Sequence, residues 1–161
     1  METVEKERIG LLAASLFATF SVLVLGCVVI APALNIWYAE LLKPVFNPPN
    51  WVFAPVWIVL YAAMASAAYL VLLEGWKKAS VRKAIAAYGV QLILNLTWIV
   101  VFFGLQQTWA ALFVIALLWI AIIVNKFYFW RVRSLAGWLL VPYLLWVTFA
   151  AVLNGSIAGL N

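Results

Sequence analysis

Long apolar runs separated by short polar segments form the dominant pattern of this chain. After the charged segment METVEKER, no charged residue occurs from Ile9 to Ile30. A helix of this length measures about 33 Å at 1.5 Å per residue, which is enough to cross a bilayer. Ala31-Pro32-Ala33 resembles a signal-peptide cleavage site, but the run exceeds the ~7–15 apolar residues of such signals. The run therefore predicts a first transmembrane helix.

Four further apolar runs follow, and the short segments between them contain charged residues, glutamine or glycine. The predicted spans cover residues 9–30, 51–73, 81–103, 108–130 and 135–157. The composition agrees, because 69% of the residues are hydrophobic and only 9% are charged, against roughly 25% charged in soluble domains. The pattern predicts one all-α membrane domain over 1–161, a five-transmembrane-helix bundle. It shows no repeat of the kind that inverted-repeat transporters carry.

The connection between the first two spans, residues 31–50, is longer than a turn requires. Pro44, Pro48 and Pro49 remove backbone donors and disfavour helix in the residues before them. We therefore expect a long structured loop here rather than a flexible link. A shaped loop at the end of a bundle is a natural place for binding.

Basic residues are distributed unequally between the two sides that five spans define. One side holds Lys6, Arg8, Lys77, Lys78, Arg82, Lys83, Lys126, Arg131 and Arg133, whereas the other holds Lys43. In a plasma membrane this asymmetry predicts a cytoplasmic N-terminus. The loop 31–50 and the C-terminus would then lie on the opposite side.

Several function classes are disfavoured by the residues present. The chain has no histidine and a single cysteine, Cys27, which excludes an intrachain disulfide and predicts no metal site of the usual Cys/His type. No span carries a central carboxylate, which argues against proton-coupled pumps. No nucleophile has an evident activating base. The basic residues punctuate apolar runs and form no patch, so we expect no nucleic-acid partner.

Amide and aromatic side chains share helix faces inside the spans. Gln91, Asn95 and Trp98 have i, i+4, i+7 spacing, and Trp57 with Tyr61 has i, i+4 spacing. An amide in a span is commonly interhelical hydrogen-bonding glue, worth about 0.6–2 kcal/mol. For Asn95, this interpretation and direct ligand contact remain equally open.

Two tryptophans lie deeper than the interfacial belt that accounts for most indoles in membrane proteins. Trp57 lies about 9 Å inside its predicted helix at 1.5 Å per residue, and Trp146 lies near the middle of its own. A deep indole needs a partner for its ring N–H. Gln91, Asn95 or a ligand is the candidate partner, and the pattern suits a flat, mostly apolar ligand.

Small residues recur every fourth position in two predicted helices. Gly10, Ala14 and Ala18 do so in the first, and Ala62 with Ser66 in the second. Such stripes let helices approach closely. They indicate either packing within the chain or a homodimer seam.

Three ordered motifs together resemble a known family. The matching segments are Trp37-Tyr38, Lys43-Pro44, Asn47-Pro48-Pro49, Trp51, Trp57 and Leu60-Tyr61; Gln91 to Asn95 with Trp98 and Phe102-Phe103-Gly104; and Pro142-Tyr143 to Trp146 with Leu153-Asn154. In this order they resemble the TspO/translocator protein (TspO/MBR) family, over residues 37–154.

The resemblance implies a five-helix membrane receptor or regulator, commonly a homodimer, that binds porphyrins such as protoporphyrin IX under a lid formed by the first loop. Membrane lipid is the other expected partner, and no required cofactor is implied. Carried onto this sequence, the family's ligand-binding residues are Tyr38, Phe53, Trp57, Tyr61, Gln91, Asn95, Trp98, Trp146 and Ala150.

Two alternatives follow from the same resemblance. Some bacterial relatives suggest light-dependent porphyrin degradation, in which Trp57 and Trp146 would be the catalytic residues. Transport of the tetrapyrrole or of a lipid is the third possibility. Because the chain has no histidine, a bound haem would lack that axial ligand, and metal-free porphyrin is therefore favoured over haem. A tyrosine is the axial ligand that a haem could still use.

One departure concerns sterols. The family's cholesterol-recognition segment requires a tyrosine followed by a basic residue near the end of the fifth helix. After Leu153-Asn154 this chain reads Gly-Ser-Ile-Ala-Gly-Leu-Asn and has neither. The pattern is weak even when complete, and we expect no strong sterol binding.

Overall fold

The computed structural model describes residues 2–161, apart from the side chain of Thr3, and these residues form helices joined by short connections. The elements are α1 (Glu2–Leu34), α2 (Trp37–Glu40), α3 (Asn50–Leu72), α4 (Ala79–Ile99), the π-helix η1 (Val100–Gly104), α5 (Thr108–Val132), α6 (Ser134–Leu139) and α7 (Val141–Leu160). The described residues contain no strand. The predicted all-α fold class is confirmed.

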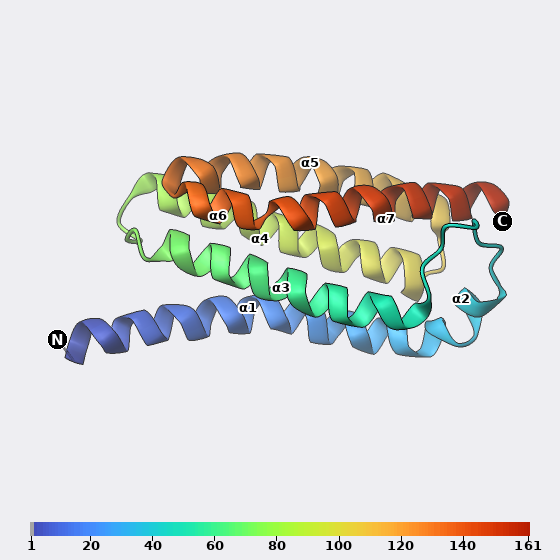
Figure 1. Ribbon diagram of the computed structural model, residues 1–161, viewed down its shortest axis with the longest axis horizontal. Helices are drawn as coiled ribbons and strands as arrows, with labels where there is room; N and C mark the ends of the chain where they lie inside the picture. The colour runs from blue at the N-terminus through green and yellow to red at the C-terminus, as the bar shows by residue number, and fades with distance from the viewer. Residues whose placement is uncertain (1) are drawn as a thin grey trace.

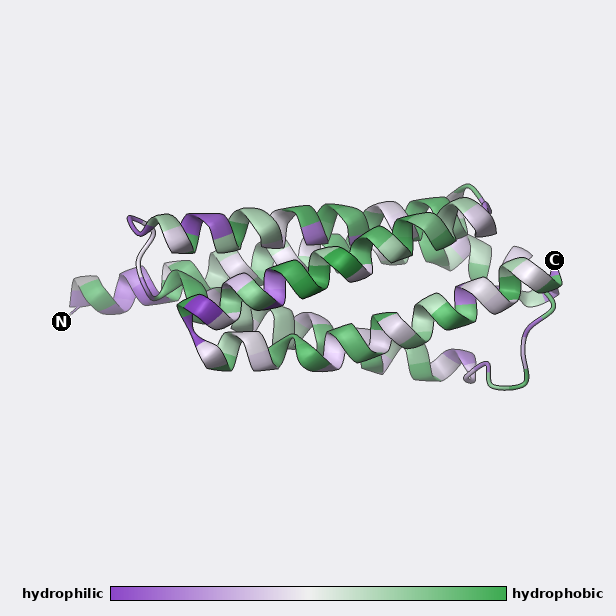
Figure 2. Cartoon of the chain, turned by 90° about the horizontal axis from the view of Figure 1, so that it is seen from above, coloured by the Kyte–Doolittle hydropathy of each residue, from purple (hydrophilic) through white to green (hydrophobic). Residues whose placement is uncertain are grey.

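Within residues 2–161, five helical segments are long and apolar enough to span a membrane: Val4–Leu34, Asn50–Leu72, Ala79–Gly104, Thr108–Val132 and Ser134–Leu160. They run side by side as one bundle (Figure 1). Hydrophobic residues cover the middle of the helices, while many hydrophilic residues lie towards the ends (Figure 2). The five predicted spans agree with these segments to within a few residues, except at the start of the first.

The first and last spans differ from the prediction in detail. α1 begins at Glu2, so the charged segment before the first apolar run is helical. The fifth span is two helices, α6 and α7, interrupted at Leu140. Pro142 explains the interruption, because it has no backbone N–H to donate to the Trp138 carbonyl four residues earlier. Helical bonding resumes where Leu144 N–H donates to the Leu140 carbonyl at 3.0 Å.

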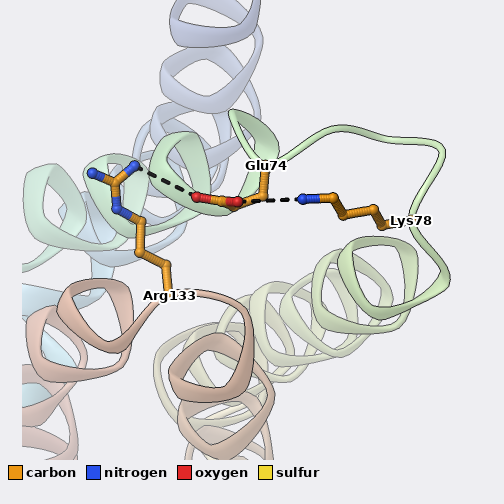
Figure 3. Close-up of polar contacts among 3 residues, drawn as sticks. All are labelled: Glu74, Lys78 and Arg133. Carbon is orange, nitrogen blue, oxygen red and sulfur yellow. Dashed lines mark hydrogen bonds and ion pairs between the residues drawn. The ribbon is translucent and has the colours of Figure 1, made fainter.

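The two ends of the bundle differ in character. The N-terminus lies at one end, and the C-terminus and α2 lie together at the other (Figure 1). At the N-terminal end, Glu74 accepts from Lys78 at 3.4 Å and lies 3.9 Å from Arg133, joining the end of α3 to the α5–α6 junction (Figure 3). These groups are partly exposed, so the contact adds little stability. The cytoplasmic placement of the N-terminus stays a prediction.

Neither small-residue stripe packs within the chain. Gly10, Ala14 and Ala18 are exposed on α1, as are Ala62 and Ser66 on α3. A Cβ added at Gly10 would meet no atom within 4 Å. The interpretation that these stripes serve intrachain packing is therefore wrong. The alternative, a homodimer seam, stays a prediction.

Candidate functional site

A cavity of about 710 Å³ lies in the half of the bundle nearest α2. This volume is typical of sites for drug-sized ligands. Its walls come from the second half of α1, the first half of α3, the end of α4 with η1, and α7, and Tyr38 of α2 contributes from the lid. We use the word lid for residues 35–49, between α1 and α3.

Large aromatic side chains form much of the cavity wall. The Trp57 ring lies 5.8 Å from that of Tyr61 and 6.4 Å from those of Trp98 and Trp146. Phe53 packs on Trp146 at 6.0 Å in an edge-to-face arrangement. These separations are typical of favourable aromatic pairs. The rings come from three helices and hold one another in place, which prepares the wall for a flat ligand.

The indole N–H groups of this wall have different environments. Trp98 Nε1 donates to Asn154 Oδ1 at 3.1 Å, and Asn154 Nδ2 donates to the Thr108 carbonyl at 2.9 Å, so the Trp98 ring is fixed. Trp146 Nε1 is buried and has no hydrogen-bond partner among the described residues. An unpaired buried donor costs about 1–3 kcal/mol, but this nitrogen is closed to an atom the size of water, so the Trp146 ring would have to turn before a ligand acceptor could reach it.

Asn95 lies beneath the cavity and does not line it. Tyr61 Oη donates to Asn95 Oδ1 at 2.6 Å, and Asn95 Nδ2 donates to Tyr143 Oη at 2.8 Å. All three side chains are fully buried. Asn95 thus connects α3, α4 and α7 by the interhelical hydrogen bonds that one of the two interpretations predicted, and its contact with a ligand stays a prediction.

Gln91 is also absent from the cavity wall. Its Nε2 donates to the Met64 sulfur at 3.3 Å, and its Oε1 accepts from Asn125 Nδ2 at 2.8 Å. It is fully buried among α3, α4 and α5. The geometry therefore gives Gln91 a structural role, and neither amide is the partner of the Trp57 or Trp146 N–H that the sequence suggested.

The lid closes the cavity at the end of the bundle through specific contacts. Tyr38 is buried, and burial raises the pKa of its hydroxyl above the usual value, so the group stays protonated. It donates to Asn47 Oδ1 at 2.9 Å, while Lys43 Nζ lies 4.8 Å from the centre of its ring. Asn47 N–H donates to the Pro44 carbonyl at 2.9 Å, closing a turn. The lid is an ordered structure, as its prolines predicted.

The Asn161 side chain at the end of α7 both accepts a hydrogen bond from the lid backbone and donates one to it. Leu42 N–H donates to Asn161 Oδ1 at 3.0 Å, and Asn161 Nδ2 donates to the Leu42 carbonyl at 3.0 Å. The same nitrogen also donates to the Ile157 carbonyl at 2.9 Å. These bonds join segments 119 residues apart in the sequence.

A π-helical turn places two phenylalanines at the site. Leu105 N–H donates to the Val100 carbonyl, five residues earlier, at 2.8 Å. Phe102 and Phe103 lie in this turn and both line the cavity. Phe102 stacks on Trp98 at 5.8 Å and contacts Trp37 at 5.4 Å. Turns of this type recur at functional sites, and here one extends the aromatic wall up to the lid.

Seven of the nine residues predicted to bind ligand line the cavity: Tyr38, Phe53, Trp57, Tyr61, Trp98, Trp146 and Ala150. Their contact with a ligand stays a prediction. The sequence missed the α1 wall, including Leu23, Cys27 and Ile30, and also Phe102, Phe103 and Asn154. The motif Phe102-Phe103-Gly104 supported the resemblance but was assigned no role.

The chemistry available at this site is that of shape, aromatic stacking and a few hydrogen bonds. Within the described residues, the side chains that line the cavity carry no formal charge, and no group of three or more His, Cys, Asp or Glu residues could hold a metal ion. The arrangement suits binding of a flat apolar molecule.

Comparison with known proteins finds matches to one family profile and to members of the same family. The profile of the TspO/MBR family matches residues 13–160. The chain is 47% identical over 125 residues to the tryptophan-rich protein TspO of Chlorobaculum tepidum, covering 78% of this chain and 79% of that protein. It is 39% identical over 151 residues to the tryptophan-rich protein TspO of Archaeoglobus fulgidus, covering 93% and 96%.

The similarity extends to animal proteins. The chain is 41% identical over 123 residues to the human translocator protein, covering 73% of this chain and 70% of that protein. The family profile spans the lid, the cavity wall, most of the first membrane segment and all of the other four. The chain therefore belongs to the TspO/MBR family of integral, multi-pass membrane proteins.

Proposed function

We propose that this protein binds a tetrapyrrole such as protoporphyrin IX, or a related flat apolar molecule, in the aromatic cavity. The observation that carries the proposal is a 710 Å³ cavity walled by Trp57, Trp98 and Trp146, with the buried Trp146 N–H lacking a partner. Membership of the TspO/MBR family, with its translocator and tryptophan-rich sensory proteins, supports a role as membrane receptor or regulator.

The ligand would lie against the indoles with its acidic edge at the lid. A porphyrin ring offers a large π face for stacking, and its carboxylates need water or a positive charge. Lys43, over the Tyr38 ring, is the basic residue at this end. A porphyrin orientation with its carboxylates towards Lys43 avoids placing charge among the apolar helices.

The proposal is tested by titrating the protein with protoporphyrin IX and following tryptophan quenching. Replacing both Trp57 and Trp146 by leucine removes two stacking partners, each worth ~0.5–1.5 kcal/mol. We expect binding to weaken roughly 5- to 150-fold. The matched control is Trp109→Leu, an exposed tryptophan at the start of α5, which should bind like the unmodified protein. Unchanged affinity in the double variant would mean that the ring binds elsewhere.

Light-dependent breakdown of the bound ring is the alternative that the contact between Trp57 and Trp146 favours. The two rings are 6.4 Å apart and both face the cavity, so a bound macrocycle would touch both. Illuminating the complex and recording its absorption spectrum separates the two functions. A new product that disappears in Trp57→Phe or Trp146→Phe would establish chemistry, whereas an unchanged spectrum leaves reversible binding.

Transport across the membrane is less well supported by the packing. Beneath the cavity, Tyr61, Asn95 and Tyr143 are fully buried and bonded to one another. A porphyrin crossing the bundle would have to separate these groups. Vesicle uptake of protoporphyrin IX measures this directly.

A further inference from the structure

One side of the cavity is edged by residues that are also exposed on the outside of the bundle. On α1, Val24, Val28 and Ala31 line the cavity, and all three are exposed, Val24 and Val28 at 61% and 68%. Their i, i+4, i+7 spacing places them in one stripe along the helix.

A matching stripe lies on α3. Asn50, Ala54 and Ile58 line the cavity at i, i+4, i+8 and are all exposed, Ile58 at 52%. The stripe extends about 12 Å along the helix at 1.5 Å per residue. Side chains that are both cavity-lining and exposed mark an opening. We call this opening, between the two stripes, the α1–α3 slot.

The wall opposite the slot, the lid end and the base of the cavity are closed, while on the α3–α7 side the half-buried rings of Phe53 and Trp146 pack 6.0 Å apart. Across from the slot, Trp98 and Phe102 of α4 and η1 are only 8% and 3% exposed, and Ile157 of α7 is 1% exposed. At the end of the bundle, Tyr38 is 3% exposed and the lid is bonded to Asn161. Below the slot, Phe20 of α1 packs on Tyr61 of α3, with ring centres 6.5 Å apart.

The slot faces the bilayer rather than water. Both stripes lie within membrane-spanning segments, and five of their six residues are apolar. The sixth, Asn50, is the first residue of α3, next to Trp51, which is 74% exposed and has the position of an interfacial tryptophan. The slot therefore extends from the interface into the hydrocarbon layer.

We propose that ligands reach the cavity sideways from the bilayer, through the α1–α3 slot, and not from water through the lid. This inference rests on the proposed function for its ligand and defines the ligand class: molecules that partition into the membrane with their polar edge at the interface. Such a molecule slides between apolar stripes without burying a charge at any stage. The lid then seals the cavity from water.

The test uses variants that narrow the α1–α3 slot and measures the rates of porphyrin association and dissociation. The protein is reconstituted in phosphatidylcholine vesicles containing protoporphyrin IX, and binding is followed as relaxation of porphyrin fluorescence after a temperature jump. Val28→Trp and Ile58→Trp each place a bulky ring at one edge of the slot, and we expect both association and dissociation to slow about tenfold. If these substitutions instead weakened the contact between the ligand and the cavity wall, dissociation would become faster.

Two controls locate the route. Leu25→Trp adds the same ring to α1 at a position that is 52% exposed but does not line the cavity, and it should leave both rates unchanged. Asn161→Ala removes the two hydrogen bonds between Asn161 and the Leu42 backbone of the lid and should not speed relaxation. If Asn161→Ala accelerates binding while the slot variants do not change it, the route is through the lid and the inference is wrong.

A second measurement needs no porphyrin, so it separates failure of the route from failure of the proposed function. A phosphatidylcholine carrying a diazirine in its acyl chain is photolysed with the reconstituted protein. Acyl chains that enter the slot should label Trp98 or Phe102, which are buried behind it. We expect this labelling to fall about tenfold in Val28→Trp and to persist in Leu25→Trp. No labelling at these two residues in the unmodified protein would overturn the inference.

Discussion

The two halves of α3 differ in packing, because one half lines the cavity and the other packs closely against neighbouring helices. Its buried residues lie between Leu60 and Val71, from the middle of the helix onwards. Small side chains, Ala65, Ala67 and Ala68, allow neighbouring helices to approach there and exclude space. In the first half, Phe53 and Trp57 are half-buried and face the cavity. Side-chain size along one helix thus divides the bundle into a packed half and a hollow half.

This division has a functional consequence. In the packed half, amide and hydroxyl groups bind one another, as in Gln91 with Asn125 and Asn95 with Tyr61. Among the described residues, each half also keeps one buried atom without a partner, Asn125 Oδ1 in the packed half and Trp146 Nε1 in the hollow half. The packed half is therefore held by hydrogen bonds between helices, whereas the cavity wall is held largely by contacts between aromatic rings.

The strongest test compares truncation of a phenylalanine in each half. Phe129 in α5 is fully buried against Tyr88, with ring centres 5.7 Å apart. Phe129→Ala should lower the free energy of unfolding by about 3–5 kcal/mol. Phe53→Ala, on the cavity wall, should cost less than ~1.5 kcal/mol, about the worth of its contact with Trp146. Thermal unfolding in detergent measures both. Equal losses would show that the cavity half is packed as tightly as the other.

The second test asks whether Asn95 is structural. Asn95→Leu keeps a similar size but leaves the Tyr61 and Tyr143 hydroxyls without their amide partner, which should destabilise the fold by about 1–3 kcal/mol. Because Asn95 does not line the cavity, protoporphyrin IX affinity of the folded variant should change less than threefold, roughly 0.6 kcal/mol. Loss of affinity with unchanged stability would instead support the direct ligand contact that the sequence left open.

The membrane spans were predictable because the bilayer imposes a length and an apolar composition on each helix. The aromatic wall was predictable in part, since Trp57 and Trp146 lie too deep for the interfacial belt. The α1 wall was not, because lipid-facing and cavity-facing residues of a span are both apolar. For this reason Cys27, which lines the cavity, could not be distinguished from Leu25, which does not.

Two further features needed the three-dimensional structure. The partners of Asn95 come from α3 and α7, and spacing within one helix does not reveal contacts between helices. The π-helical turn at Phe102 and Phe103 inserts a residue into the helical repeat and so changes which face these side chains occupy. A regular 3.6-residue period therefore did not assign them to the site.

The smallest expected effect concerns the lid, and it can be measured at one amide. Asn161→Ala removes the acceptor of the Leu42 N–H, a bond worth about 0.5–1.5 kcal/mol. Hydrogen exchange at the Leu42 amide should become roughly 2- to 10-fold faster. The Asn47 amide is the internal control, because it donates to the Pro44 carbonyl within the lid turn and should keep its protection. Faster exchange at Asn47 as well would mean that Asn161 orders the whole lid, and no change at Leu42 would mean that Tyr38 holds the lid without it.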